Sequence, residues 1–253
     1  MSPEKFPVGD SAREAIDSLR GYVYQIFQSA LAWTELNEGE FLFLEVAEDY
    51  AVAAQNALKA VQVKETAGSV TINSDDIVAS IDSFVELRER NPGMDVTLRH
   101  LTTSTIGKEK KVGDRVNGLP TLDAWRKLAK AGDLTELRQV LAESKLSKKT
   151  KEFIEGFDDA GLRENFLKKI YFDCGAADSE FLARKIKSRV SSLLIDRGGV
   201  HSQSKACLDR IMMAVLQLST NPNREERFLD RNSLEEILEE ATRVESVRFS
   251  VYP

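Results

Sequence analysis

Residues 41–65, with the sequence FLFLEVAEDYAVAAQNALKAVQVKE, decide the fold of this 253-residue chain. Successive side chains of a β-strand point to opposite faces, and residues 41–48 alternate in this way. The pattern predicts a strand in which Glu45 and Asp49 lie on the same face. Leucine and valine side chains dominate the other face, so the strand can be buried in a sheet while it presents two carboxylates.

The second half of this stretch predicts a turn and a returning strand. Residues 50–54 remain extended, 55–56 form the turn, and 58–65 return beside the first strand. On the returning strand, Gln62 and Lys64 share a face at a spacing of about 6.6 Å. The two strands therefore gather carboxylates, an amide and an ammonium group in one hairpin.

Helix and strand patterns on both sides of the hairpin predict an α/β domain over residues 10–118. Apolar residues at helical spacing predict a helix before the hairpin, and Asp10 or Ser11 is its expected cap. A short strand, a second helix and a β-branched strand are expected after the hairpin. These elements flanking the hairpin cover residues 10–36, 69–72, 74–90 and 95–103.

A mainly helical extension is expected over residues 119–253. Short amphipathic patterns that start at Ser, Thr or Asp predict its helices. These helices cover residues 121–131, 133–144, 147–156, 179–194, 204–218 and 233–242. Residues 165–175 are expected to add a strand edge, and residues 247–252 are expected to be extended.

Composition favours a folded cytoplasmic protein. Hydrophobic residues make up 42% of the chain and charged residues 30%, which is enough for a buried core. The formal net charge of -6 argues against a histone-like coating of nucleic acid. It does not exclude a nuclease, because a cleft that collects Mg²⁺ is itself acidic and basic patches can be local. Two cysteines and two histidines without metal-binding spacing argue against a zinc site. The sequence lacks an apolar signal region and an apolar run of membrane-spanning length, so we expect no membrane association.

The polar residues of the hairpin are those that metal-dependent phosphodiester hydrolysis needs. This reaction requires an activated water, stabilisation of the charged phosphorane and help for the leaving oxygen. Asp49 is the best direct Mg²⁺ ligand, Glu45 can bind directly or through water, and Gln62 can offer an amide oxygen. Lys64 can orient or deprotonate the attacking water, or stabilise the charged transition state.

Three motifs resemble the PD-(D/E)xK nuclease superfamily, namely GYVYQ at 21–25, LEVAED at 44–49 and VQVK at 61–64. More closely, they are similar to the double-strand DNA endonuclease domain at the N-terminus of CBASS anti-phage effectors. The resemblance covers residues 18–104 most strongly and the rest in layout only. It implies a restriction-endonuclease-like core, in which helices flank a mixed central sheet, followed by the mainly helical extension.

The resemblance also implies roles for single residues. Asp49 matches the metal-binding aspartate, and Lys64 matches the catalytic lysine. Gln62 matches a position that is acidic in much of the superfamily, so this site has one negative charge fewer. The acidic companions and the helix glutamine that borders such sites match Glu45, Glu48 and Gln25.

The implied activity is that of a DNA endonuclease in bacterial anti-phage defence. Its expected cofactor is Mg²⁺, with Mn²⁺ as a substitute, and its expected substrate is double-stranded DNA. The resemblance further implies that a sensor domain follows the nuclease and that homo-oligomerisation activates it. A basic run after the last core strand is expected to contact the phosphate backbone beside the scissile strand. This run contains Lys108, Lys110, Lys111 and Arg115.

Two other interpretations remain open on the sequence alone. In the first, the same fold binds nucleic acid or assembles into oligomers, with little or no cleavage. In the second, the chain is a helical interaction protein and the strand motif is coincidental. His100, on the last core strand, is more typical of a packed or hydrogen-bonded residue than of a catalyst.

Overall fold

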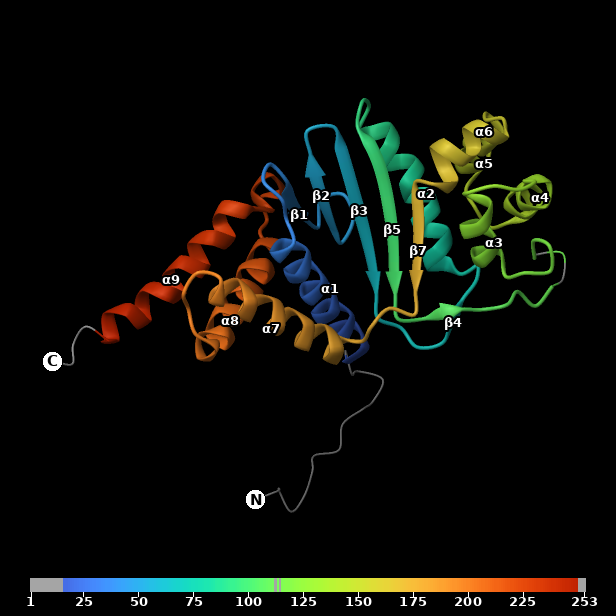
Figure 1. The fold of residues 1–253 in the computed structure, drawn as a ribbon. Helices are drawn as coiled ribbons and strands as arrows, with labels where there is room; N and C mark the ends of the chain where they lie inside the picture. Colours follow the sequence, from blue (N-terminus) through green and yellow to red (C-terminus); the bar gives the residue numbers. More distant parts are fainter. Residues whose placement is uncertain (1–15, 112, 114, 250–253) are drawn as a thin grey trace, which may run out of the picture.

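A mixed six-stranded β-sheet forms the centre of the fold (Figure 1). The computed structural model describes residues 16–111, 113 and 115–249. The strands are β1 (Phe41–Leu44), β2 (Tyr50–Ala54), β3 (Ala57–Lys64), β5 (Asp95–Thr102), β7 (Ile170–Cys174) and β8 (Phe228–Asp230). They lie in the order β7-β5-β3-β2-β1-β8, with β7, β5 and β3 parallel and the other neighbours antiparallel. The α/β class expected from the sequence is confirmed.

Helices cover both faces of this sheet and form two hydrophobic cores, one on each face (Figure 1). One core contains Tyr50 and Val61 of the sheet and belongs to α1 (Ile16–Thr34), α7 (Ser179–Ile195), α8 (Ser204–Ser219) and α9 (Arg231–Phe249). The other core contains Ala60 and Leu98 and belongs to the helices between β3 and β7. These are α2 (Asp75–Arg90), α3 (Thr121–Leu128), α4 (Thr135–Glu143), α5 (Lys148–Glu155) and α6 (Asp159–Leu162), with a π-helical turn at Arg163–Leu167. Among the described residues, no helix combines the length and the apolarity needed to cross a membrane.

The first strand of the hairpin is shorter than its alternation predicts. β1 ends at Leu44, which pairs with Tyr50 of β2, and residues 45–49 form the connection between these two antiparallel strands. Glu45 has a φ of 53°, a left-handed conformation that no strand residue adopts. The prediction of one strand over 41–48, with Glu45 and Asp49 on one strand face, was therefore wrong.

The strand predicted at 69–72 exists but does not join the central sheet. β4 (Ser69–Val70) pairs in parallel with β6 (Thr105–Ile106) in a separate two-stranded sheet. The helix and strand expected at 74–90 and 95–103 are confirmed as α2 and β5. The expected cap at Asp10 or Ser11 lies outside the described residues.

Residues after 118 complete the central sheet as well as adding helices. The strand expected within 165–175 is confirmed as β7, and the unpredicted β8 pairs with β1 at the opposite edge. All six helices expected in this region are present as α3, α4, α5, α7, α8 and α9. The extended segment expected at 247–252 is wrong for residues 247–249, which belong to α9, and its remainder lies outside the described residues.

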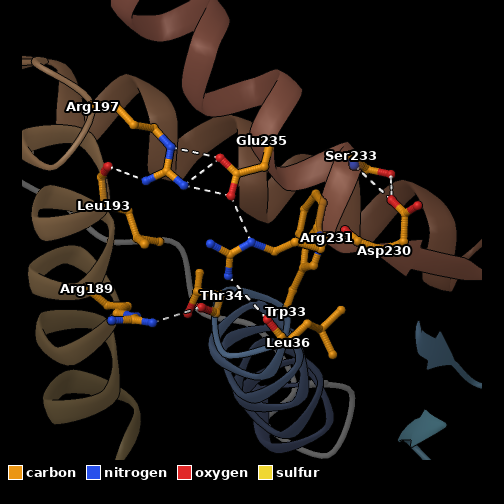
Figure 2. Close-up of polar contacts among 10 residues, drawn as sticks. All are labelled: Trp33, Thr34, Leu36, Arg189, Leu193, Arg197, Asp230, Arg231, Ser233 and Glu235. Carbon is orange, nitrogen blue, oxygen red and sulfur yellow. Dashed lines mark hydrogen bonds and ion pairs between the residues drawn. The ribbon is translucent and has the colours of Figure 1, made fainter. Parts of the chain in front are cut away.

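The C-terminal helices dock on the end of α1 through arginine side chains (Figure 2). The last carbonyls of a helix lack helical partners, and α1 has no basic residue in its own last turn. Arg189 donates to the Thr34 carbonyl at 3.3 Å, and Arg231 donates to the Leu36 carbonyl at 3.2 Å. The Trp33 indole also donates to the Asp230 carbonyl at 2.7 Å. These bonds between distant segments fix the C-terminal helices against the core.

A three-residue ion network supports this docking (Figure 2). Glu235 accepts hydrogen bonds from Arg197 and Arg231, with nitrogen–oxygen distances of 2.6 and 2.8 Å. Both guanidinium groups lower the pKa of Glu235 and outweigh the effect of its partial burial, which raises that pKa. The carboxylate therefore stays ionised and joins the turn that follows α7 to α9.

Candidate active site

The polar residues of the hairpin meet at the end of β3 and the beginning of β2. Tyr50 pairs with Val61 in antiparallel register, so the next pair along the strands places Asp49 beside Gln62. Gln62 and Lys64 alternate with the buried Val63 and point to the face that α2 covers. The structure therefore brings Asp49 together with the Gln-x-Lys motif, although by a turn rather than by a shared strand face.

The loop at residues 45–49 carries three carboxylates. Its backbone turns through a bond from the Glu45 amide to the Asp49 carbonyl at 3.1 Å. The left-handed conformation of Glu45 costs roughly 1–3 kcal/mol for a residue with a side chain. Asp49 is anchored separately, because its Oδ2 accepts a hydrogen bond from the Val63 amide at 2.6 Å. This charge-assisted bond ties the loop directly to β3.

The folded structure disfavours the ionised form of all three carboxyl groups of this loop. Burial and the neighbouring Asp49 charge raise the pKa of Glu45, against the lowering effect of Arg227 and Lys64. Burial also raises the pKa of Glu48, which a hydrogen bond from Ser83 partly offsets. A bound cation would stabilise the ionised form of carboxyl groups whose pKa values are raised in this way.

Asp49 has the same disfavoured charge despite several favourable contacts. Burial raises its pKa more than the Val63 amide, the Lys64 ammonium and a hydrogen bond from Gln25 lower it. Gln25 comes from α1, so this helix glutamine does border the carboxylate, as its predicted position requires. Its role in the reaction stays a prediction.

The side chain of Gln62 is held by a serine and a histidine. Its Oε1 accepts from the Ser80 hydroxyl on α2, and it lies 3.1 Å from Nδ1 of His100 on β5. The Ser80 hydroxyl and this Nδ1 are also only 2.7 Å apart. The same hydroxyl lies 2.8 Å from the Asp76 carbonyl oxygen, and a hydroxyl has only one proton to donate. The oxygen expected to bind a metal therefore lies in a polar cluster with a serine and a histidine.

His100 is neutral in this position, because burial lowers its pKa to about 4. Its side chain is fully buried, and its Nε2 has no hydrogen-bond partner among the described residues. The sequence-based interpretation of a packed, hydrogen-bonded histidine is confirmed. Its contact with Gln62 arises from the parallel pairing of β3 and β5, which brings the two residues side by side. This pairing was not predicted from the sequence.

Lys64 lies close enough to the acidic loop to act on it electrostatically. Its charge lowers the pKa of all three loop carboxyls and of His100. Within the described part of the chain, its ammonium is not in an ion pair of 4.0 Å or less. An ammonium that is near several carboxylates but paired with none can act on a water or a phosphate.

The donor set suits a hard cation that keeps part of its water shell. Mg²⁺ takes oxygen ligands and often uses only one or two carboxylates. Asp49 supplies one such carboxylate, and Glu45 a second on the same loop. No group of three or more His, Cys, Asp or Glu side chains that could hold a metal occurs among the described residues. Asp49 and Glu45 are the carboxylates of this loop that could hold a partly hydrated Mg²⁺ or Mn²⁺.

The basic run after β5 starts at the same end of the sheet as Lys64, since the Thr103 amide donates to the Lys64 carbonyl at 3.1 Å. Beyond β6 the chain leads away from the sheet towards α3 and α4 (Figure 1). Its three lysines, Lys108, Lys110 and Lys111, are exposed. Arg115 differs, because its Nε donates to the Glu109 carbonyl at 2.9 Å and its guanidinium serves the loop itself.

Several residues around the site escaped sequence reasoning. Ser80 and Ser83 of α2 bind Gln62 and Glu48, and they lie between the buried apolar residues of that helix. Ser80 is buried, and a polar residue on the apolar face of a helix is a signal that could have been read from the sequence. Arg224 and Arg227, which also contact the loop, gave no such signal.

By sequence, this chain matches no protein-family description and no curated protein. Its fold does match solved structures of Cap4, a SAVED/CARF-domain containing receptor. The Acinetobacter baumannii receptor with the cyclic trinucleotide 2'3'3'-cAAA matches with a TM-score of 0.56 and 15% identity, over 97% of this chain and 49% of that chain.

Two further Cap4 structures agree with this match. The Acinetobacter baumannii receptor whose description names no nucleotide gives a TM-score of 0.54 and 14% identity, over 92% of this chain and 48% of that chain. The Moraxella osloensis receptor gives 0.51 and 14%, over 87% and 47%. This chain thus spans about half the length of the receptors that it matches. At such low identity the match establishes the fold.

Proposed function

We propose that this chain is a metal-dependent DNA endonuclease domain of the PD-(D/E)xK type. The observation that carries the proposal is the meeting of Asp49 with the Gln62-x-Lys64 motif at one end of β2 and β3. Two further observations support it. The chain shares its fold with the Cap4 receptors, and its three sequence motifs resemble the endonuclease domain of CBASS effectors. The mixed sheet, the spacing of the motifs and the raised pKa values of the loop carboxyls are all consistent with the proposed activity.

In the proposed reaction, each residue of the site has a separate task. Asp49, together with Glu45 of the same loop, would hold Mg²⁺ through carboxylate oxygens. When bound, the ion supplies a Lewis acid for the scissile phosphate and lowers the pKa of a bound water. Lys64 orients the attacking water, or stabilises the charge that develops on the phosphate oxygens. The Val63 amide keeps Asp49 in place throughout.

The wider role follows from the resemblance to CBASS effectors. Double-stranded DNA is the proposed substrate, and anti-phage defence is the proposed setting. Activation through homo-oligomerisation, directed by a separate sensor, completes this proposal. The exposed lysines at 108, 110 and 111 are the proposed contacts to the phosphate backbone.

The test is a plasmid cleavage assay with a matched lysine control. Lys64→Ala should abolish cleavage in Mg²⁺, whereas Lys59→Ala should leave it intact. Lys59 belongs to the same strand, but its side chain is 60% exposed and pairs with Glu40 instead of the loop. EDTA should stop the wild type. Equal cleavage by the wild type and Lys64→Ala would refute the assignment of the site.

A second function is favoured by the hydrogen bonds of Gln62. Its oxygen lies in contact with Ser80 and His100, so a protein with weak metal affinity that only binds nucleic acid would show the same arrangement. Fluorescence anisotropy with a DNA duplex in EDTA distinguishes the two. Tight binding without nicking at any Mg²⁺ concentration would favour the binding module.

A further inference from the structure

A short C-terminal segment lies directly against the acidic loop. We name residues 221–230 the strap; they comprise the 3-10 turn Arg224–Glu226 and strand β8. Phe228 of the strap pairs with Phe43 of β1, two positions before the loop begins. The strap is thus next to the candidate active site, although it is far from that site in the sequence.

The strap supplies hydrogen bonds that the acidic loop cannot make for itself. Arg227 Nη1 donates to the Glu45 carbonyl at 3.1 Å, across 182 positions of sequence, and Arg224 donates to the Val46 carbonyl. In return, the Leu44 amide donates to the Arg227 carbonyl at 2.9 Å. These bonds surround Glu45, the residue with the left-handed backbone. A strained conformation persists only where its surroundings hold it.

The strap is itself ordered by side-chain hydrogen bonds. Arg227 Nε donates to the Asn221 carbonyl at 2.6 Å, which leaves Nη1 directed at the loop. Glu226 accepts from Asn221 at 3.0 Å and from Asn223 at 2.8 Å. The guanidinium of Arg227 therefore bridges two backbone carbonyls from separate segments, a task that needs its fixed fork of donors.

We propose that Arg227 and Arg224 are positioning residues, and that the strap holds the acidic loop in the geometry that its carboxylates need. Neither arginine takes part in bond making. Their effect on cleavage rests on the proposed function, but their effect on the loop backbone does not. The bonds that reach the loop come from Arg224 and Arg227, before α9 begins at Arg231.

The test compares Arg227→Gln with Arg231→Gln by hydrogen exchange in EDTA. The reporters are the Leu44 amide, which donates to the backbone carbonyl of Arg227, and the Glu45 amide, which donates to the backbone carbonyl of Asp49. Arg227→Gln should raise their exchange at least about tenfold, since a bond from a charged donor is lost and the loop opens locally. Arg231→Gln removes bonds to Leu36 and Glu235 but none to the loop, and should leave these two amides unchanged.

Two results would overturn the proposal, namely unchanged exchange in Arg227→Gln or an equal rise in Arg231→Gln. Should Arg227→Gln fail to fold, Arg227→Lys replaces it, because lysine keeps the charge but cannot bridge both carbonyls. In protein that cleaves DNA, Arg227→Gln should lower kcat more than it raises KM. A wild type that never cleaves would count against the nuclease proposal alone, since the exchange result still decides the role of the strap.

Discussion

Replacement of Asp49 by asparagine and by alanine should affect stability in different ways. Burial raises the pKa of Asp49 in the folded protein. The stability that protonated Asp49 contributes is therefore complete below its unfolded value of 3.8 and is lost as the pH rises through the raised folded pKa. Near neutral pH the charge works against folding, and Asp49→Asn removes it.

The size of the difference follows from the Val63 amide. The asparagine side chain would keep an oxygen that accepts this bond, whereas alanine would leave the amide of a buried residue without a partner. An unsatisfied buried donor costs about 1–3 kcal/mol. For a domain of this size, a loss of about 2 kcal/mol lowers the Tm by about 4–8 °C. We therefore expect Asp49→Ala to melt several degrees below Asp49→Asn.

Differential scanning calorimetry in EDTA measures this order without any need for activity. Near neutral pH, Asp49→Asn should melt at or above the wild type, and Asp49→Ala below Asp49→Asn. At about pH 3, where the wild-type carboxyl is protonated, the advantage of asparagine over the wild type should shrink. Addition of Mg²⁺ at about ten times its Kd should raise the free energy of unfolding of the wild type by about 1.4 kcal/mol. The free energy of unfolding of both variants should stay unchanged.

One result would refute this reasoning. If Asp49→Ala melts as high as Asp49→Asn, the bond from Val63 does not anchor the loop. The description of the site as a turn held on β3 would then be wrong. If Mg²⁺ raises the Tm of all three proteins equally, the ion binds elsewhere, and the assignment of Asp49 as a ligand fails while the stability argument stands.

Three further predictions concern the surroundings of Asp49. Gln62→Glu should lower the Tm in EDTA, because it adds a carboxyl beside disfavoured ones, and should enlarge the gain in Tm on addition of Mg²⁺; an unchanged gain would exclude position 62 from the metal site. His100 has a folded-state pKa of about 4 against 6.5, so the stability from its neutral form is present above pH 6.5 and is lost as the pH falls towards 4. Urea unfolding should show that the wild type loses up to about 3 kcal/mol more than His100→Asn over this range, whereas parallel losses would contradict the burial argument. Alanine at three exposed lysines should reduce the salt dependence of DNA binding by about 2.7 in log–log slope, and the same change at Lys148, Lys149 and Lys151 should not. The three lysines are Lys108, Lys110 and Lys111.

Local sequence patterns by themselves determined most of the secondary structure and the motif. The alternation around Gln62 and Lys64, the helical spacing of α2 and the β-branched run of β5 each depend on neighbours a few positions apart. Such signals can be read before any contact is known. They also sufficed for the expectation that Asp49 lies near Gln62, because an antiparallel hairpin brings its own two strands together.

How the site is held depends on contacts between distant segments of the chain. The alternation over 41–48 continued through Glu45, but the Glu45 carbonyl accepts a hydrogen bond from Arg227 that favours a turn there. A partner 182 positions away is invisible to a local pattern. The three residues of β8 are too few for any period to show, yet they pair with β1 from a distant part of the sequence. The contact of Gln62 with His100 likewise needed the parallel pairing of β3 with β5. Contacts between distant segments depend on packing and register, which no local spacing contains.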